Sequence, residues 1–79
     1  MNGMIDESIT VGVIFVRGSV KPVWFSWHGG QVRIQEITLT WKSREGNTPI
    51  LHFSVTDGLG LYEIRYNTGT FAWRLTASA

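Results

Sequence analysis

The side chains of this 79-residue chain that could do acid–base or metal chemistry are two histidines and six carboxylates. His28 lies beside a Gly-Gly pair and is expected in a turn, whereas His52 lies on the polar side of an apolar stretch. Neither histidine has an acidic cluster beside it, and two isolated imidazoles are a poor metal site. The chain has no cysteine, which excludes disulfides, thiolate catalysis and cysteine zinc sites. We therefore predict a protein that is not an enzyme and has no catalytic residue, no metal site and no cofactor.

Two further patterns suggest chemistry that their surroundings do not favour. Asp6 and Glu7 are adjacent carboxylates, but they lie in a polar N-terminal segment without a low-dielectric pocket that could separate their pKa values. The run DGLG at 57–60 contains a Gly-x-Gly pair, which in a nucleotide-binding loop would open a helix. Here the glycines precede an alternating apolar stretch, and they indicate a hairpin turn.

Aromatic and basic side chains are the remaining candidates for a binding surface. Strand alternation places seven aromatic side chains on inward faces, namely Phe25, Trp27, Phe53, Tyr62, Tyr66, Phe71 and Trp73. Trp41 is predicted to face inward as well, because it follows Ile37 and Leu39 in one phase. Trp24 points opposite to Phe25, so it is either an exposed aromatic or packed under the N-terminal strand. The predicted binding residues are Trp24 and the outward-facing Arg33, His52, Arg65 and Arg74.

The elements that would position these side chains are strands. Turn signals recur about every ten residues and separate six alternating or β-branched runs, at 9–16, 23–27, 31–41, 50–56, 61–66 and 71–76. No stretch has the periodicity of an amphipathic helix. Val32 and Ile34 are out of phase with Ile37, so a β-bulge near Gln35 and Glu36 should bend the third strand.

The predicted fold is all-β, a single small antiparallel meander of about six strands curled into an SH3-like barrel or half-open roll. The barrel domain would span residues 9–76, between a flexible N-terminal tail at 1–8 and a C-terminal tail at 77–79. The net charge is only +1. There is no basic region followed by a long apolar run, so we expect a soluble cytoplasmic protein that does not bind a membrane.

Two motifs resemble a known family. FSWHGGQVRIQEITLTW has an aromatic-x-Trp-x-Gly pattern followed by a strand that ends in tryptophan, and LYEIRYNTGTFAWRL has a tyrosine-led strand, an N-T-G turn that resembles the N/D-x-x-T-G turn of the family, and a W-x-L strand. Over residues 21–76 they resemble a short bacterial domain of unknown function, found as stand-alone small β proteins and sometimes encoded beside Y-family translesion polymerase genes. The resemblance implies a DNA-repair context. It supplies no catalytic residues, and the matching positions Trp27, Gly29, Trp41, Tyr62, Gly69 and Trp73 are fold signatures.

These observations predict a non-catalytic interaction module that binds a protein or peptide partner through a sheet edge or through the surface around Trp24. The alternative is a nucleic-acid-binding barrel in a DNA-repair context, which would use the outward arginines and an exposed aromatic. The protein would be a monomer or a weak homodimer, because an unclosed barrel leaves strand edges free.

Overall fold

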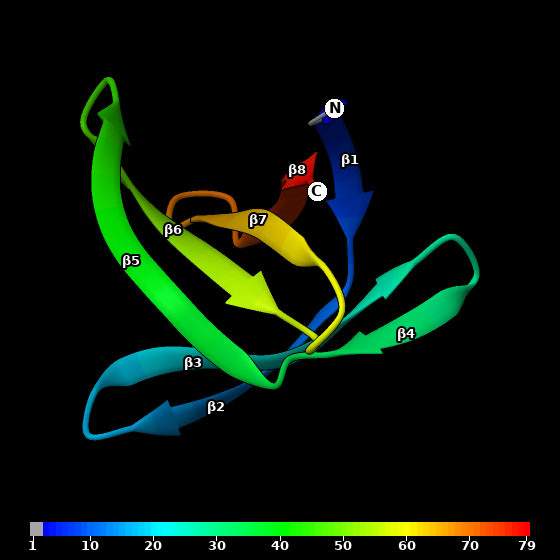
Figure 1. Ribbon diagram of the computed structural model, residues 1–79. Helices are drawn as coiled ribbons and strands as arrows, with labels where there is room; N and C mark the ends of the chain where they lie inside the picture. Colours follow the sequence, from blue (N-terminus) through cyan, green and yellow to red (C-terminus); the bar gives the residue numbers. More distant parts are fainter. Residues whose placement is uncertain (1–2) are drawn as a thin grey trace.

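The computed structural model describes residues 3–79 and is all-β, as predicted, with no helix in this range (Figure 1). The strands are β1 (Gly3–Ile9), β2 (Val11–Val16), β3 (Ser19–Trp27), β4 (Gly30–Arg33), β5 (Glu36–Glu45), β6 (Thr48–Thr56), β7 (Leu61–Asn67) and β8 (Ala72–Ser78). They form a five-stranded sheet of order β1-β8-β7-β6-β5 and a three-stranded sheet of order β2-β3-β4, with antiparallel neighbours throughout.

The described residues thus hold eight strands rather than the predicted six or so. Thr10 alone separates β1 from β2, and Ile34 and Gln35 separate β4 from β5. At these two corners the backbone N–H of Ser26 donates to the carbonyl of Thr10 at 2.9 Å, and that of Ile34 donates to the carbonyl of Val23 at 3.0 Å. The chain bends from one sheet into the other at each corner. The predicted bend near Gln35 and Glu36 is therefore found, but as a break between β4 and β5 and not as a β-bulge within one strand.

Of the predicted SH3-like barrel or half-open roll, the barrel is wrong, because the two sheets do not close into one. Figure 1 shows the β2–β3 and β3–β4 hairpins extending on opposite sides of the five-stranded sheet. Both hairpins turn through two residues of positive φ, Arg17 (52°) and Gly18 (78°) in the first, His28 (51°) and Gly29 (74°) in the second. Such type I′ turns match the right-handed strand twist and hold the register tightly. The expected turn at His28 is therefore confirmed.

The ends of the chain also differ from the prediction. Residues 1–8 were expected to form a tail, whereas β1 runs from Gly3 and pairs with β8, with Ser8 opposite Arg74 and Ile9 opposite Trp73. The other end of β8 reaches Ser78, past the expected domain limit at 76. Residues 1 and 2 lie outside the described range.

The core lies where the two sheets face each other. Five buried side chains form its centre, namely Phe25, Phe53, Val55, Ile64 and Leu75. Trp27, Tyr62, Tyr66 and Trp73 pack against it, as the alternation predicted. The ring centroids of Tyr66 and Trp73 lie 4.7 Å apart. The rings of Phe25 and Tyr62 meet edge-on, with their centroids 5.3 Å apart.

Two aromatic assignments are wrong for local reasons. A second register shift, between Ile37 and Leu39, places Trp41 opposite His52 and turns it to the outer face of the five-stranded sheet. Phe71 lies in the β7–β8 turn with a φ of 62° and 75 % of its surface exposed. Its position in the turn, rather than in β8, takes it out of the core.

Candidate binding surfaces

The structure divides the five predicted binding residues between two surfaces. His52 and Arg65 are directly opposite each other on β6 and β7, and Arg65 is opposite Arg74 on β8. These three side chains share the outer face of the five-stranded sheet. Trp24 and Arg33 are opposite each other on β3 and β4, in the three-stranded sheet. Of the four predicted cationic residues, only Arg33 therefore lies opposite Trp24.

On the outer face of the five-stranded sheet, His52 stacks on Trp41. Their ring centroids lie 5.0 Å apart with an interplanar angle of 5°. A hydrogen bond of 2.7 Å joins the Nε2 atom of His52 to the Oγ atom of Ser43. Burial, followed by the positive charge of Arg65, lowers the pKa of His52, so both disfavour the protonated imidazole.

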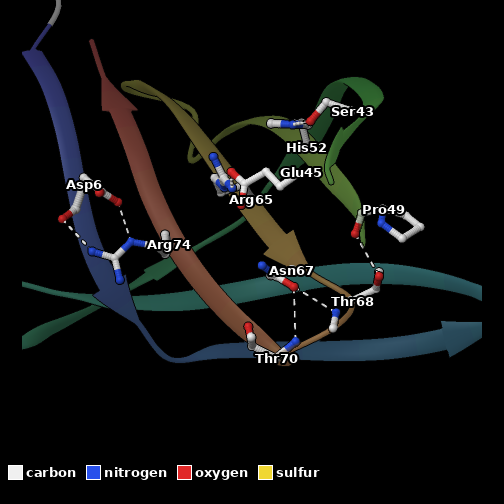
Figure 2. A network of polar contacts seen from close by, with 11 residues as sticks. Asp6, Ser43, Glu45, Pro49, His52, Arg65, Asn67, Thr68, Thr70 and Arg74 are labelled. Atoms are coloured by element: carbon white, nitrogen blue, oxygen red, sulfur yellow. Dashed lines mark hydrogen bonds and ion pairs between the residues drawn. The ribbon is translucent and has the colours of Figure 1, made fainter. Parts of the chain in front are cut away.

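Both arginines on this face are paired with carboxylates (Figure 2). Arg65 forms an ion pair with Glu45, and Arg74 forms one with Asp6 and also donates to the Asp6 carbonyl at 2.9 Å. A hollow of about 380 Å³ lies between the two pairs. Because each cation already has a counter-charge, this face has no excess positive charge for a phosphate backbone.

The hydrogen-bonded Ser43 and His52 resemble part of a nucleophilic site, but other parts are missing. Among the described residues, no hydrogen bond orients the other ring nitrogen of His52, and Ser43 is exposed on an open sheet face. A serine nucleophile needs an oriented base and a water-excluded oxyanion site. No group of three histidine or acidic side chains in residues 3–79 could hold a metal ion.

The tight turn predicted at DGLG is confirmed by the hydrogen bonds of Asp57. Its Oδ1 atom accepts from the backbone N–H groups of Gly60 (2.8 Å) and Leu59 (2.9 Å), which lower its pKa. The hydroxyl of Tyr62 donates to Oδ2 at 3.3 Å, and burial together with this carboxylate raises the pKa of Tyr62. The turn leaves Leu59 99 % exposed at its tip.

Trp24 is half-buried because its indole covers Gly12. The two residues are opposite each other on β3 and β2, and a Cβ atom on Gly12 would lie 2.0 Å from the indole Nε1 atom. The exposed part of Trp24 is on the outer face of the three-stranded sheet, next to Arg33. A glycine inside the apolar run VGVIFV was the sequence signal for this close approach, since strand glycines often mark such sites.

The free edge of β2 has three consecutive exposed apolar side chains. Their exposed fractions are 45 % for Ile14, 74 % for Phe15 and 47 % for Val16. The strand is at the border of its sheet and, in the described part of the chain, pairs only with β3. The sequence predicted this strand but not the exposure of its side chains. Alternation within one strand does not show whether that strand has a neighbour on each side.

Hairpin register shows which backbone groups of β2 point outward. The two-residue turn makes Val16 and Ser19 a hydrogen-bonded pair, so Ile14 and Lys21 form the next one. Phe15 and Val13 occupy the intervening non-bonded positions, where N–H and C=O point away from β3. Pro22 lies opposite Val13 and has no N–H to donate. It is therefore compatible with a position that makes no hydrogen bond between β2 and β3.

The other border strands are protected against pairing. Charged residues occur in β1 (Asp6, Glu7) and throughout β5 (Glu36, Lys42, Arg44, Glu45). The register shifts of the β1–β8 and β5–β6 pairs place the extra residue in these border strands, whereas the shift of the β2–β3 pair places it in β3. β4 has only four residues. Charges, bulges and short length are the usual means by which sheet edges avoid unwanted pairing. β2 has six residues, none of them charged.

Comparisons with protein-family models, with curated proteins and with solved structures found no match to this chain. The resemblance to the bacterial domain family stays a prediction. In residues 3–79 there is also no helix long and apolar enough to cross a membrane.

Proposed function

We propose that the protein is a non-catalytic interaction module that binds an extended segment of a partner protein as an additional strand beside β2. The observation that carries this proposal is the uncharged outer edge of β2, with Ile14, Phe15 and Val16 exposed. Within residues 3–79 the N–H and C=O groups of Val13 and Phe15 point away from β3 and have no strand partner. Strand addition uses main-chain hydrogen bonds for affinity and side-chain contacts for specificity.

The edge offers enough interactions for a transient complex. Val13 and Phe15 together supply two donors and two acceptors, each worth about 0.5–1.5 kcal/mol net when paired. Covering the side chain of Phe15 would contribute about 1.5–3 kcal/mol more. Part of this free energy is lost in ordering the partner segment, so we expect dissociation constants on the order of 10 µM.

A display library of random peptides of about ten residues, long enough for one strand, tests the proposal. Peptides selected on the wild-type protein should bind through the edge and lose binding to Val13→Pro. Proline there removes the outward N–H, and edge strands tolerate it. Val13→Thr keeps the N–H and the branched shape, so it is the matched control and should bind normally. The proposal fails if no peptide is enriched, or if the enriched peptides bind Val13→Pro as well as they bind the wild type.

A second candidate function is binding of single-stranded nucleic acid on the outer face of the three-stranded sheet. It is favoured by the half-exposed Trp24, which could stack on a base, and by Arg33 opposite to it, which could contact a phosphate. Quenching of tryptophan fluorescence by an oligothymidylate should then weaken with salt and disappear in Trp24→Phe, whereas Trp41→Phe should retain it. Quenching that is insensitive to salt, or equal in both variants, would exclude this function.

A further inference from the structure

We propose that the segment that binds beside β2 is acidic, with Asp or Glu side chains that meet Arg17 and Lys21 of the β2–β3 hairpin. This inference rests on the strand addition proposed above and adds the chemistry of the partner. It follows from the way charge is divided between the two sheets.

The strands of the three-stranded sheet have cations and no carboxylate of their own, although Glu36 of β5 lines the same hollow as Lys21 and Arg33 and Glu7 of β1 accepts from Trp27. Arg17, Lys21 and Arg33 lie between Thr10 and Gln35, a stretch of the chain without any Asp or Glu. The rest of the chain has four basic and six acidic side chains, and both ion pairs of the described residues, Arg65–Glu45 and Arg74–Asp6, occur there. The net charge of +1 is therefore the sum of +3 on residues 10–35 and −2 on the rest of the chain.

Two of the three cations lie close to the free edge. Arg17 is the first residue of the turn that ends β2, and Lys21 is directly opposite Ile14. An added strand would lie about 4.8 Å beyond β2, and the aliphatic stem of Lys21 can cross Ile14 to bring its ammonium group near it. Acidic side chains of the added segment would meet both cations if they lie on its outer face, at the end nearest to the β2–β3 turn.

The same charges disfavour a second copy of this chain as the occupant. Two copies joined at their β2 edges would form one six-stranded sheet containing twice the three cations and no carboxylate. Like charges gathered on one sheet repel, whereas complementary charges select a partner and speed its association. The edge therefore fits an acidic segment of another protein better than it fits itself.

The display selection of the preceding section, repeated on charge variants, tests this inference. Wild-type protein should enrich peptides with at least one Asp or Glu, and Arg17→Glu/Lys21→Glu should enrich basic peptides instead. The matched control is Lys42→Glu/Arg44→Glu, which makes the same change in net charge on β5. A synthetic peptide from the wild-type selection should bind Arg17→Glu/Lys21→Glu at least about tenfold more weakly, and the control about normally.

The outcomes separate this inference from the proposed function. If selected peptides bind and require the free edge, yet show no acidic preference, the acidic partner is wrong and strand addition stands. An equal loss of binding in the β5 control would show that net charge alone matters, which also overturns the inference. A dimer in sedimentation experiments that disappears in Val13→Pro would identify a second copy as the occupant and would overturn it too. If no peptide binds at all, strand addition itself fails.

Discussion

The substitution Gly12→Ala tests how Trp24 is held on the three-stranded sheet. A Cβ atom at position 12 would lie 2.0 Å from the indole Nε1 atom and 2.2 Å from Cε2, whereas ordinary contact begins at 3.4 Å. The indole must therefore retreat by about 1.4 Å, since the paired strands fix both backbones. The retreat exposes the ring that now covers β2.

The free-energy change has two opposing parts. Forcing an extra methyl group into a packed site costs about 1–3 kcal/mol. Replacing glycine by alanine within a strand, where nothing obstructs it, stabilises by about 0.5–1 kcal/mol. Gly12→Ala should thus lower the free energy of unfolding by about 1–2 kcal/mol in the wild type. In a Trp24→Val background it should raise the free energy of unfolding by about 0.5–1 kcal/mol, because the obstruction is gone.

Urea unfolding of the four proteins in this double-mutant cycle measures the coupling between positions 12 and 24. The free energy of unfolding of a domain of this size falls by about 1 kcal/mol per molar urea. The urea concentration at the midpoint of unfolding should therefore be lower by about 1–2 M in Gly12→Ala. Its tryptophan emission should also shift toward the red as the indole enters water. If Gly12→Ala destabilises the Trp24→Val protein as much as the wild type, the strain lies in the backbone and the contact with the indole is not its cause.

Three further substitutions test the packing and the electrostatics. Leu75→Ala removes a fully buried core side chain and should cost about 2–5 kcal/mol in urea unfolding, and a cost below about 1 kcal/mol would place Leu75 outside the core. Phe71→Asn should stabilise by about 0.5–1 kcal/mol, because asparagine tolerates the left-handed backbone and the phenyl ring is mostly exposed; a lower midpoint would mean that the ring makes a stabilising contact. Since the pKa of His52 is lowered by burial and by Arg65, the unfolded chain binds more protons near and below its ordinary value of 6.5, and stability falls as the pH decreases through that region. Thermal unfolding of His52→Gln should show a smaller loss between about pH 7.5 and about pH 5.5, and an equal loss would assign the pH dependence to another group.

Most strands could be located from the sequence because turn chemistry and alternation are local properties. The His28-Gly29 turn and the DGLG turn each join two strands, and the phase change before Ile37 falls at a corner between the sheets. β1 was missed, since it lies in the expected tail, and β3 begins at Ser19, directly after the Arg17-Gly18 turn, instead of at the predicted position 23. Barrel closure and the number of strands are not local properties of the sequence. They depend on how far the two sheets diverge after each corner at which the chain passes between them. The register shift near Thr38 also leaves no clear sequence signal, and it reverses the direction of Trp41.

The candidate surfaces were harder to predict, because they depend on pairs that are distant in the sequence. Arg65 and Glu45 are separated by 20 positions, and Arg74 and Asp6 by 68. Alternation correctly placed both arginines on outward faces, yet it could not show that each has a carboxylate beside it. The same limit applies to β2, whose apolar residues are typical of a central strand. Only the topology shows that this strand is a border.

The contrast among the border strands is the strongest reason to regard the β2 edge as functional. Packing alone does not require Phe15 to be apolar, since 74 % of its surface is exposed, and Ile14 and Val16 are about half exposed beside it. An unprotected apolar edge favours aggregation, and this chain protects its other long edges with charges and register shifts. An edge left open beside Arg17 and Lys21, which form no ion pair with any residue from 3 to 79, is instead suited to a partner that supplies both a strand and the opposite charge. The cations would then serve two purposes, because they repel a second copy of the chain and attract an acidic segment.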